Sequence, residues 1–342
     1  MPQFHKLTIK EVKKETKDAV SIVFDVPEKL KETYKFQAGQ YVTLKKDIEG
    51  DELRRAYSIC SDPNSGILKI AVKAVDGGTF SVYANNMLHA GDKIEVSEPE
   101  GRFVIAPEKG KHYLGIAVGS GITPILSMIK ATMHPEAHFT LIYGNKSVED
   151  TIFKSRLDDL KNIYSTQLDI HYVYSREEVA GTLSGRIDAD KIKYILGDTT
   201  FEQAFICGPE RMIHDATDAL VANGFDKDDV KFELFSVPVE KNDDDSVPEG
   251  NTEITVVLDD EETTFIMPKN KMILNAALDK DLDPPYSCQG GICSSCLCKV
   301  VEGKAEMKVN QILSEEEVAE GMILSCQAQP VTPTIKVDFD DV

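Results

Sequence analysis

Three cysteines stand close together in the run Cys288-Gln-Gly-Gly-Ile-Cys293-Ser-Ser-Cys296, and Cys326 follows about thirty residues later. Three thiolates on a tight loop and a fourth on a distant segment can surround an inorganic cluster in which each iron takes two thiolates besides the bridging sulfides. Gly290 and Gly291 let the loop backbone approach closely and direct N–H groups at sulfur. The spacing C-x4-C-x2-C with one distant cysteine is typical of [2Fe–2S] sites.

Other readings of the cysteines are weaker. A zinc ribbon usually carries two C-x2-C knuckles, and the second is missing here. A secreted disulfide scaffold is short and rich in cysteine throughout, whereas the seven cysteines of this long chain are odd in number and five of them gather near its end. Cys298 is expected to face inward from a strand, although a role as substitute ligand is also open. Cys60 is expected to pack in a core.

The cysteine loop lies inside a block, Thr252–Val342, that begins and ends with strand-like alternating stretches. Residues 239–251 precede it and are polar, acidic and closed by proline and glycine, which predicts a linker. The block holds more acidic than basic residues. Its surface therefore suits either solvation or docking to a basic face of a partner protein.

The whole chain is acidic as well. Its 342 residues carry a net charge of −20, which makes nucleic acid an unexpected partner. No apolar run approaches the roughly 18 residues of a membrane span, and the first residues do not resemble a secretory signal. We therefore expect no membrane association and a cytoplasmic location.

Two further blocks precede the linker. Residues 1–106 contain many short strand-like runs broken by glycine, proline and aspartate, which predict a small antiparallel β-barrel. Residues 107–238 alternate buried strands with helices, which predicts βαβ units and a parallel sheet. Within the second block, Gly119, Ser120 and Gly121 lie between a strand and a helix, where glycines allow the backbone to approach a pyrophosphate.

Arg55-Ala-Tyr-Ser58 resembles the R-x-Y-S signature of the ferredoxin–NADP reductase superfamily. Arginine can donate to a flavin pyrophosphate, tyrosine can stack on the flavin ring, and serine can hydrogen-bond near its reactive nitrogen N5. Alone, such a run is commonplace in strands. A glycine-rich helix start suited to the same phosphate follows at Gly77-Gly-Thr-Phe-Ser81. The superfamily's closing P-x-G-x-F turn is matched by Pro99-Glu-Gly-Arg-Phe103.

The second block carries the superfamily's other motifs. Val118–Pro124 resembles its nucleotide loop, Cys207-Gly-Pro209 its motif beside the nicotinamide, and Glu233-Leu-Phe235 its aromatic ending. Ser175 and Arg176 match the pair that holds a 2′-phosphate, which favours NADPH over NADH, although a solvated loop is the alternative. Phe235 is expected to shield the flavin, with core packing as the alternative.

The resemblance implies complete site assignments. The implied catalytic residues are Ser58, Thr123, Cys207 and Glu233. The implied FAD-binding residues are Arg55, Ala56, Tyr57, Ser58, Lys73, Gly78, Thr79, Phe80, Ser81, Thr123 and Phe235, with FMN left open as the flavin. The implied NADP-binding residues are Gly119, Ser120, Gly121, Ser175, Arg176, Cys207, Gly208 and Pro209.

Thr252–Val342 looks like a plant-type ferredoxin domain. The resemblance implies a β-grasp fold and the cluster ligands Cys288, Cys293, Cys296 and Cys326. The order of flavin, nucleotide and ferredoxin domains resembles oxygenase reductases, especially those of phenylacetyl-CoA epoxidase systems, and also those of ketosteroid hydroxylases.

The implied function is electron transfer from NADPH through FAD and a [2Fe–2S] cluster to an oxygenase component. A Rieske-type oxygenase as the acceptor, an electron carrier or redox sensor without turnover, and a scaffold with decayed sites remain as alternatives.

Overall fold

The computed structural model describes residues 3–235 and 250–342, and it divides the chain into two compact units. One unit is Phe4–Phe235, and the other contains the described residues from Gly250 onward. Most of the predicted linker, 239–251, lies outside the described residues. The proposed boundary between residues 106 and 107 falls within the first unit.

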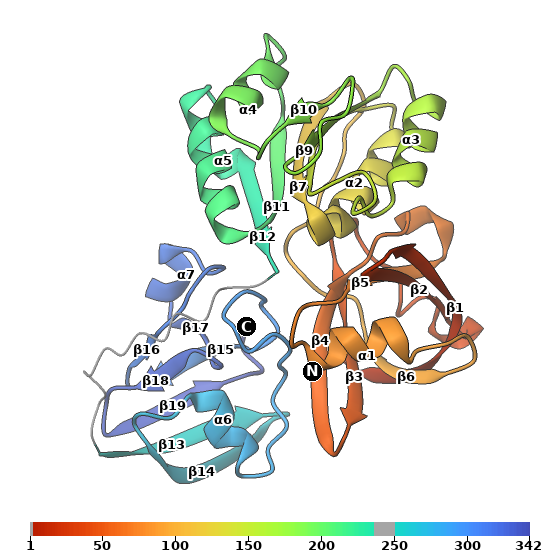
Figure 1. Cartoon of the computed structure of the whole chain (residues 1–342). Coiled ribbons are helices and arrows are strands. Elements are labelled where there is room, and N and C mark those ends of the chain that lie inside the picture. Colours follow the sequence, from red (N-terminus) through yellow and green to blue (C-terminus); the bar gives the residue numbers. More distant parts are fainter. Residues whose placement is uncertain (1–2, 236–249) are drawn as a thin grey trace. The chain divides into compact units, whose positions relative to one another are not determined.

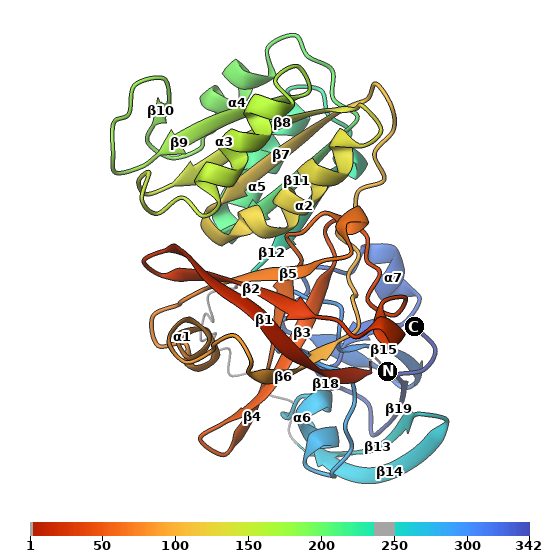
Figure 2. The same ribbon diagram turned by 90° about the vertical axis from the view of Figure 1, so that its right-hand side faces the viewer.

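A curled antiparallel sheet forms the beginning of the first unit (Figure 2). Its strand order is β4-β3-β6-β1-β2-β5, and a bridge between Ile59 and Ile70 brings the end of β4 back to β5, as the barrel prediction requires. The strands are β1 (Phe4–Thr16), β2 (Ala19–Asp25), β3 (Tyr41–Ile48), β4 (Asp51–Ser58), β5 (Leu68–Lys73) and β6 (Lys93–Ser97).

Inward-facing aliphatic side chains such as Ile22, Leu44 and Ile70 fill this barrel and are inaccessible to solvent. Burial of one face of each strand explains why apolar and polar residues alternate along these segments. The helix α1 (Thr79–Asn86) packs on the barrel through Phe80 and Ala84.

A parallel six-stranded sheet forms the rest of the first unit, in the order β10-β9-β8-β7-β11-β12. Figure 1 shows α4 and α5 on one side of this sheet and α2 and α3 on the other. The strands are β7 (His112–Val118), β8 (His138–Asn145), β9 (Leu168–Tyr174), β10 (Leu183–Ser184), β11 (Gln203–Gly208) and β12 (Val230–Leu234). The helices are α2 (Ile122–Met133), α3 (Lys154–Ile163), α4 (Ala189–Leu196) and α5 (Glu210–Ala222).

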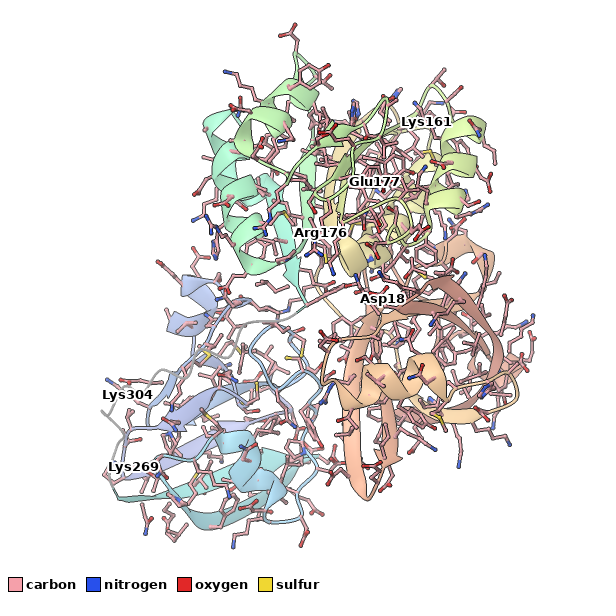
Figure 3. All side chains as sticks on the ribbon, viewed as in Figure 1. Asp18, Lys161, Arg176, Glu177, Lys269 and Lys304 are labelled. Atoms are coloured by element: carbon pink, nitrogen blue, oxygen red, sulfur yellow. The ribbon has the colours of Figure 1, made fainter. Side chains whose placement is uncertain are left out.

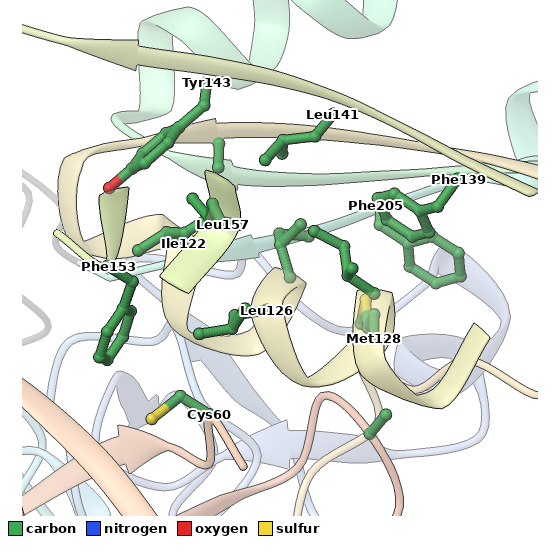
Figure 4. Close-up of a cluster of buried hydrophobic side chains, with 14 of the residues drawn as sticks. Cys60, Ile122, Leu126, Met128, Phe139, Leu141, Tyr143, Phe153, Leu157 and Phe205 are labelled. Atoms are coloured by element: carbon green, nitrogen blue, oxygen red, sulfur yellow. The ribbon is translucent and has the colours of Figure 1, made fainter. Parts of the chain in front are cut away.

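Because the strands are parallel and covered on both faces, their carboxyl ends form one edge where loops can gather around a ligand. The buried core between α2 and the sheet includes Phe139, Leu141 and Phe205 (Figure 4).

The second unit has a mixed five-stranded sheet in the order β14-β13-β19-β15-β17 and a two-stranded sheet of β16 and β18. Its central pair, β13 and β19, is parallel, and the neighbouring pairs are antiparallel. The strands are β13 (Asn251–Leu258), β14 (Glu261–Pro268), β15 (Leu297–Glu302), β16 (Ala305–Met307), β17 (Met322–Leu324), β18 (Ala328–Pro330) and β19 (Thr334–Asp338), and the helices are α6 (Ile273–Leu278) and α7 (Glu315–Ala319).

None of the helices within residues 3–235 and 250–342 combines the length and apolar character that crossing a lipid bilayer requires.

Candidate functional site

Three of the four implied catalytic residues meet where the two sheets of the first unit adjoin. Ser58, the last residue of β4, donates a hydrogen bond from Oγ to Oε2 of Glu233 at 3.1 Å. Glu233 lies on β12 opposite Cys207 of the neighbouring strand β11. Residues 175 positions apart in the chain are thus joined by one hydrogen bond.

Burial determines the protonation states of Glu233 and Cys207. Although part of Glu233 reaches solvent, its carboxyl group lies among buried neighbours, and this burial raises its pKa to about 8, while the Ser58 hydrogen bond acts in the opposite direction. Burial also raises the pKa of the Cys207 thiol, and the nearby Glu233 raises it further. At neutral pH, Glu233 therefore holds a proton and Cys207 remains a thiol.

Thr123, the fourth implied catalytic residue, lies in the first turn of α2. Its side chain is buried, and its hydroxyl donates to the carbonyl oxygen of Ser120 at 3.1 Å. This bond holds Thr123 to the glycine loop that precedes the helix. No direct contact between Thr123 and the Ser58–Glu233 pair is among the interactions of the described residues.

The glycine loop fits closely against the end of β11. A Cβ atom on Gly121 would lie 2.1 Å from the carbonyl oxygen of Cys207, so only glycine is accommodated. Tyr143 donates from its hydroxyl to the carbonyl oxygen of Gly119 at 2.9 Å and fixes the other side of the loop. The backbone thus comes close enough to cradle a phosphate at the start of α2.

The flavin motif lies on β4, where Arg55, Ala56 and Tyr57 pair with β3. Arg55 is exposed, whereas Tyr57 is half-buried with its ring 5.9 Å from that of Phe80. Burial raises the pKa of Tyr57, so its hydroxyl remains protonated. Nη1 of Arg55 donates to the carbonyl oxygen of Arg54 at 2.6 Å, and the exposed guanidinium keeps further N–H donors that suit a flavin pyrophosphate, close to the ring of Tyr57.

The helix α1 begins at Thr79 with Gly78 as its N-cap and no side-chain cap. Its first N–H groups are therefore available to a phosphate. The Ser81 hydroxyl already has a partner within the protein, because its Oγ accepts a hydrogen bond from the backbone N–H of Val75 at 3.1 Å. Phe80 is buried and anchors the helix start to the barrel.

A cavity of about 770 Å³ opens at the carboxyl edge of the parallel sheet. It is lined by predicted nucleotide-binding residues, namely Gly119, Ser175, Arg176 and Pro209. The backbone N–H groups of Ser175 and Arg176 donate to the carbonyl oxygens of Asn145 and Lys146, each at 2.9 Å. Figure 3 shows Arg176 at the end of the parallel sheet that lies toward Asp18 of the barrel.

Sequence reasoning missed three cations in this lining, Lys146, Arg186 and Arg211. Lys146 directly follows β8, so the rule that ligands bind beyond the carboxyl ends of parallel strands could have identified it. Arg186 lies in an irregular loop and Arg211 in the first turn of α5, where the sequence carries no comparable signal.

Lys73 also lines this cavity, with its Nζ 3.6 Å from Oδ2 of Asp18. A Cβ on Gly119 would lie 3.8 Å from the same ammonium group. The structure thus brings Lys73 to the nucleotide loop, and its predicted contact with FAD stays a prediction. Phe235 ends the described part of this unit and is partly exposed at 36%. Its predicted cover of the flavin also stays a prediction.

The four predicted cluster ligands gather in the second unit as two contacting pairs. The Cys293 thiol donates to the Cys288 sulfur at 3.1 Å. A second thiol–thiol hydrogen bond joins Cys296 and Cys326. Two pairs of thiols match two irons that each require two protein thiolates.

Backbone N–H groups surround these sulfurs. Those of Gly290, Ile292 and Cys293 donate to Cys288, with the Gly290 nitrogen 3.3 Å from the sulfur, and that of Gly291 donates to Cys326. The hydrogen bond from Cys293 is the main cause that lowers the pKa of Cys288, to about 6. Such donors stabilise thiolates, so the residues present fit a [2Fe–2S] cluster.

Gln327 joins the cysteine loop to the segment of the fourth ligand. Its side-chain nitrogen donates to the carbonyl oxygen of Gln289 at 2.9 Å, and its side chain also hydrogen-bonds to the Cys326 sulfur. A Cβ on Gly291 would come within 3.0 Å of the Gln327 side chain. The glycine, whose φ is +73°, therefore makes room for this contact.

Cys298 is fully buried in the core of the second unit with Ile254, Val256 and Val337. This position agrees with the expectation of an inward-facing strand residue. Cys60 is likewise fully buried in the first unit and donates to the carbonyl oxygen of Lys69 at 3.3 Å.

Comparison with known families divides the chain into three parts. Residues 6–105 match the oxidoreductase FAD-binding domain, residues 116–218 the oxidoreductase NAD-binding domain, and residues 256–331 the 2Fe-2S iron-sulfur cluster binding domain.

Two relatives are similar over nearly their whole length. A component protein of the 1,2-phenylacetyl-CoA epoxidase of Escherichia coli (strain K12) is 41% identical, and the alignment covers 99% of each chain. The ferredoxin reductase component of the 3-ketosteroid-9-alpha-monooxygenase of Rhodococcus rhodochrous is 33% identical, with 97% of this chain and 96% of the relative covered.

Among solved structures, phthalate dioxygenase reductase shares the fold, with a TM-score of 0.63 at 24% identity over 98% of both chains. A ferredoxin NADP+ reductase from Neisseria gonorrhoeae gives a TM-score of 0.60 at 22% identity, and the match covers 69% of this chain and all of that one.

Proposed function

This chain belongs to the reductases that join an FAD-binding, a nucleotide-binding and a [2Fe–2S] domain in one polypeptide, and from that membership we propose that it transfers electrons from NADPH to the oxygenase component of a phenylacetyl-CoA epoxidase system. The observation that carries the choice of partner is the 41% identity to the Escherichia coli epoxidase component, which extends over 99% of both chains.

When bound, FAD supplies the capacity to accept a hydride and to release electrons singly to the iron–sulfur cluster. The chain's own residues supply binding and alignment. We assign Arg55 and the start of α1 to the flavin pyrophosphate, and Tyr57 to the flavin ring. Cys288, Cys293, Cys296 and Cys326 hold the cluster.

Ser58, Cys207 and Glu233 form the face against which the nicotinamide and the flavin are brought together. Because burial raises the pKa of Glu233 to about 8, this side chain is mostly protonated at neutral pH and would place no fixed negative charge beside a bound flavin. The neutral Cys207 thiol is fully buried, and the carbonyl oxygen of the same residue lies close against Gly121. Thr123, bonded back to Ser120, keeps the glycine loop in place.

The preference for NADPH is supported by the charge of the cavity. Arg176, Lys146, Arg186 and Arg211 all line it, and a 2′-phosphate adds about two negative charges to the adenosine end of the nucleotide. Asp150 and Asp215 also line the cavity, the second 3.8 Å from Arg211, so cations still outnumber carboxylates there. NADH lacks the 2′-phosphate and would meet these cations only through its pyrophosphate. The same cavity therefore discriminates between the two nucleotides by electrostatics.

The proposal is tested by reconstitution. The FAD-loaded and cluster-loaded protein is mixed with the purified oxygenase component of a phenylacetyl-CoA epoxidase, phenylacetyl-CoA and NADPH, and epoxide formation is measured. A 3-ketosteroid oxygenase component serves as the competing acceptor. We expect turnover with the epoxidase component and much less with the other. Rapid NADPH oxidation with an artificial acceptor, but none coupled to the epoxidase, would refute the assignment of the partner.

A further inference from the structure

Two side chains of α2 and that of its C-cap residue, His134, reach from the nucleotide-binding part to the same short segment of the flavin-binding part. Ser127 donates from Oγ to the carbonyl oxygen of Ser61 at 2.7 Å. Lys130 donates from Nζ to the carbonyl oxygen of Cys60 at 2.7 Å. His134 and Asp62 are joined by a 2.8 Å contact between Nε2 and Oδ2.

The spacing on the helix explains this arrangement. Positions i, i+3 and i+7 lie on one face of an α-helix, so Ser127, Lys130 and His134 point in the same direction. Their targets are three consecutive residues, 60–62, which are themselves anchored, since the backbone N–H of Cys60 donates to Lys69 of β5 at 2.8 Å. We call these three residues and their targets the α2 clasp.

The clasp connects the two cofactor motifs directly. The segment 60–62 begins two residues after Ser58, the end of the flavin motif on β4. The helix α2 begins one residue after Gly121, the end of the nucleotide loop. A displacement of the helix relative to this segment would therefore change the separation of the two motifs.

Apolar side chains lie on one side of the clasp, whereas Lys69, Arg156 and Asp62 are close enough to act on the charge of Lys130. Cys60 lies beneath α2 in the same buried cluster as Leu126 and Met128 (Figure 4). Ser127 is fully buried, and part of the Lys130 side chain reaches solvent. Burial nevertheless lowers the pKa of the Lys130 ammonium to about 8. Placing an ammonium group in such a site costs free energy, and apolar packing alone would hold the two parts together without it.

We propose that Ser127, Lys130 and His134 are positioning residues, whose bonds to residues 60–62 fix the distance and angle between the nicotinamide and the flavin. Directional hydrogen bonds set this geometry, because apolar contacts tolerate sliding whereas a bond between a donor and a chosen carbonyl oxygen does not. The inference rests on the proposed transfer from NADPH to FAD.

Hydride transfer makes a sensitive readout. A misplacement of about 1 Å can reduce the rate of such a step by up to about a hundredfold. Nucleotide affinity, in contrast, depends on the cavity at the carboxyl edge of the sheet, which contains none of the three clasp residues. A positioning role therefore predicts that the rate changes while the affinity does not.

The experiment measures flavin reduction in the fully loaded protein by anaerobic rapid mixing with increasing NADPH. For Lys130→Met, we expect the limiting rate of flavin reduction to fall on the order of tenfold, with the Kd for NADPH unchanged. Lys130→Arg retains a cationic donor and is expected to recover most of the rate. Lys109→Met removes an exposed lysine that pairs with Glu136 and is the matched control, expected to behave as wild type.

A wild-type limiting rate of flavin reduction in Lys130→Met would overturn the inference. A limiting rate in Lys130→Arg that is no higher than in Lys130→Met would overturn it as well. If Lys130→Met does not fold, the same measurement is made on Ser127→Ala. A wild-type limiting rate in that variant would also contradict the positioning role. Failure of the proposed transfer from NADPH to FAD has a separate signature, since wild-type protein would then show no flavin reduction by NADPH at all.

Discussion

Arg176 is the residue on which nucleotide preference is expected to depend most. It lines the cavity beside Lys146, whose carbonyl oxygen accepts the Arg176 backbone N–H at 2.9 Å. Its backbone is therefore fixed while its guanidinium head is exposed to a ligand. Arginine can bond a phosphate with two parallel donors, which a solvated loop residue would not need.

We predict that Arg176→Ala raises the KM for NADPH by roughly tenfold to a hundredfold, the cost of one charged hydrogen-bonding partner. The KM for NADH is expected to change little, because NADH has no 2′-phosphate. Steady-state kinetics with both nucleotides measure the difference, and Arg156→Ala, an exposed arginine of α3, is the control. Equal increases for both nucleotides would remove the NADPH preference.

Glu233 provides a prediction about pH. Its pKa rises to about 8 in the folded protein, mainly through burial. A carboxyl group with a raised pKa contributes stability that is fully present below its unfolded pKa and is lost as the pH rises through the folded value. Wild-type protein is therefore expected to lose stability relative to Glu233→Gln between about pH 5 and about pH 8.

Thermal unfolding of both proteins with excess FAD, measured across this pH range, tests the prediction. The two midpoints are expected to diverge as the pH rises, because the glutamine cannot ionise. Parallel curves would mean that Glu233 titrates normally.

Sequence alone identified Ser58, Cys207 and Glu233 by their motifs but not the bond between Ser58 and Glu233. No local periodicity links residues 175 positions apart, and their meeting depends on how the two sheets pack. Arg186 and Arg211 were missed for a similar reason, since surface cations are abundant and only the folded edge of the sheet selects the ones that face a cavity.

Among the elements, the cysteine loop and the segment of Cys326 are held together by Gln327. Its side-chain amide donates to Gln289 and hydrogen-bonds to the Cys326 sulfur. N–H donors to cluster sulfurs favour the more negatively charged, reduced state. Their loss is therefore expected to make the cluster harder to reduce.

We predict that Gln327→Leu lowers the midpoint potential of the cluster and speeds loss of iron to a chelator. A redox titration followed by electron paramagnetic resonance and the decay of visible absorbance measure the two effects. Gln289→Asn is the control, because it keeps the accepting carbonyl oxygen and asparagine tolerates the positive φ of 53° found there. An unchanged potential in Gln327→Leu would show that the side-chain bond does not reach the cluster electronically.

The strands of the barrel and most helices were predictable as elements, whereas their ends were less so. The helix α2 begins at Ile122, because the glycine loop turns directly into it. The helix α3 begins at Lys154, because Phe153 before it has a left-handed backbone with φ of 62°. The helix α4 was missed, although Asp188 caps it and its buried residues Ile192 and Leu196 stand four positions apart.

At the scale of the molecule, the division into two units predicts separable activities. A chain ending at Pro238 retains Phe4–Phe235, the unit that contains the flavin and nucleotide sites. We expect it to bind FAD and to reduce ferricyanide with NADPH at a rate similar to that of the whole protein. It is expected to deliver no electrons to an oxygenase component, because it lacks all four proposed cluster ligands.

The measurement compares the two proteins with both acceptors. Full delivery of electrons to the oxygenase by the shortened chain would show that the flavin reaches the partner directly and that the cluster is dispensable.

The described cores of the two units have no residue in common: Ile22 and Phe139 belong to cores of the first, and Ile254 and Val337 to a core of the second. Each unit therefore has apolar burial of its own, so genetic recombination at the junction carries little folding penalty. Grafting the final unit of a homologue onto this chain is expected to yield a stable hybrid that recognises that homologue's oxygenase. Recombination at this junction would change the oxygenase that accepts the electrons without changing the site that binds the nucleotide.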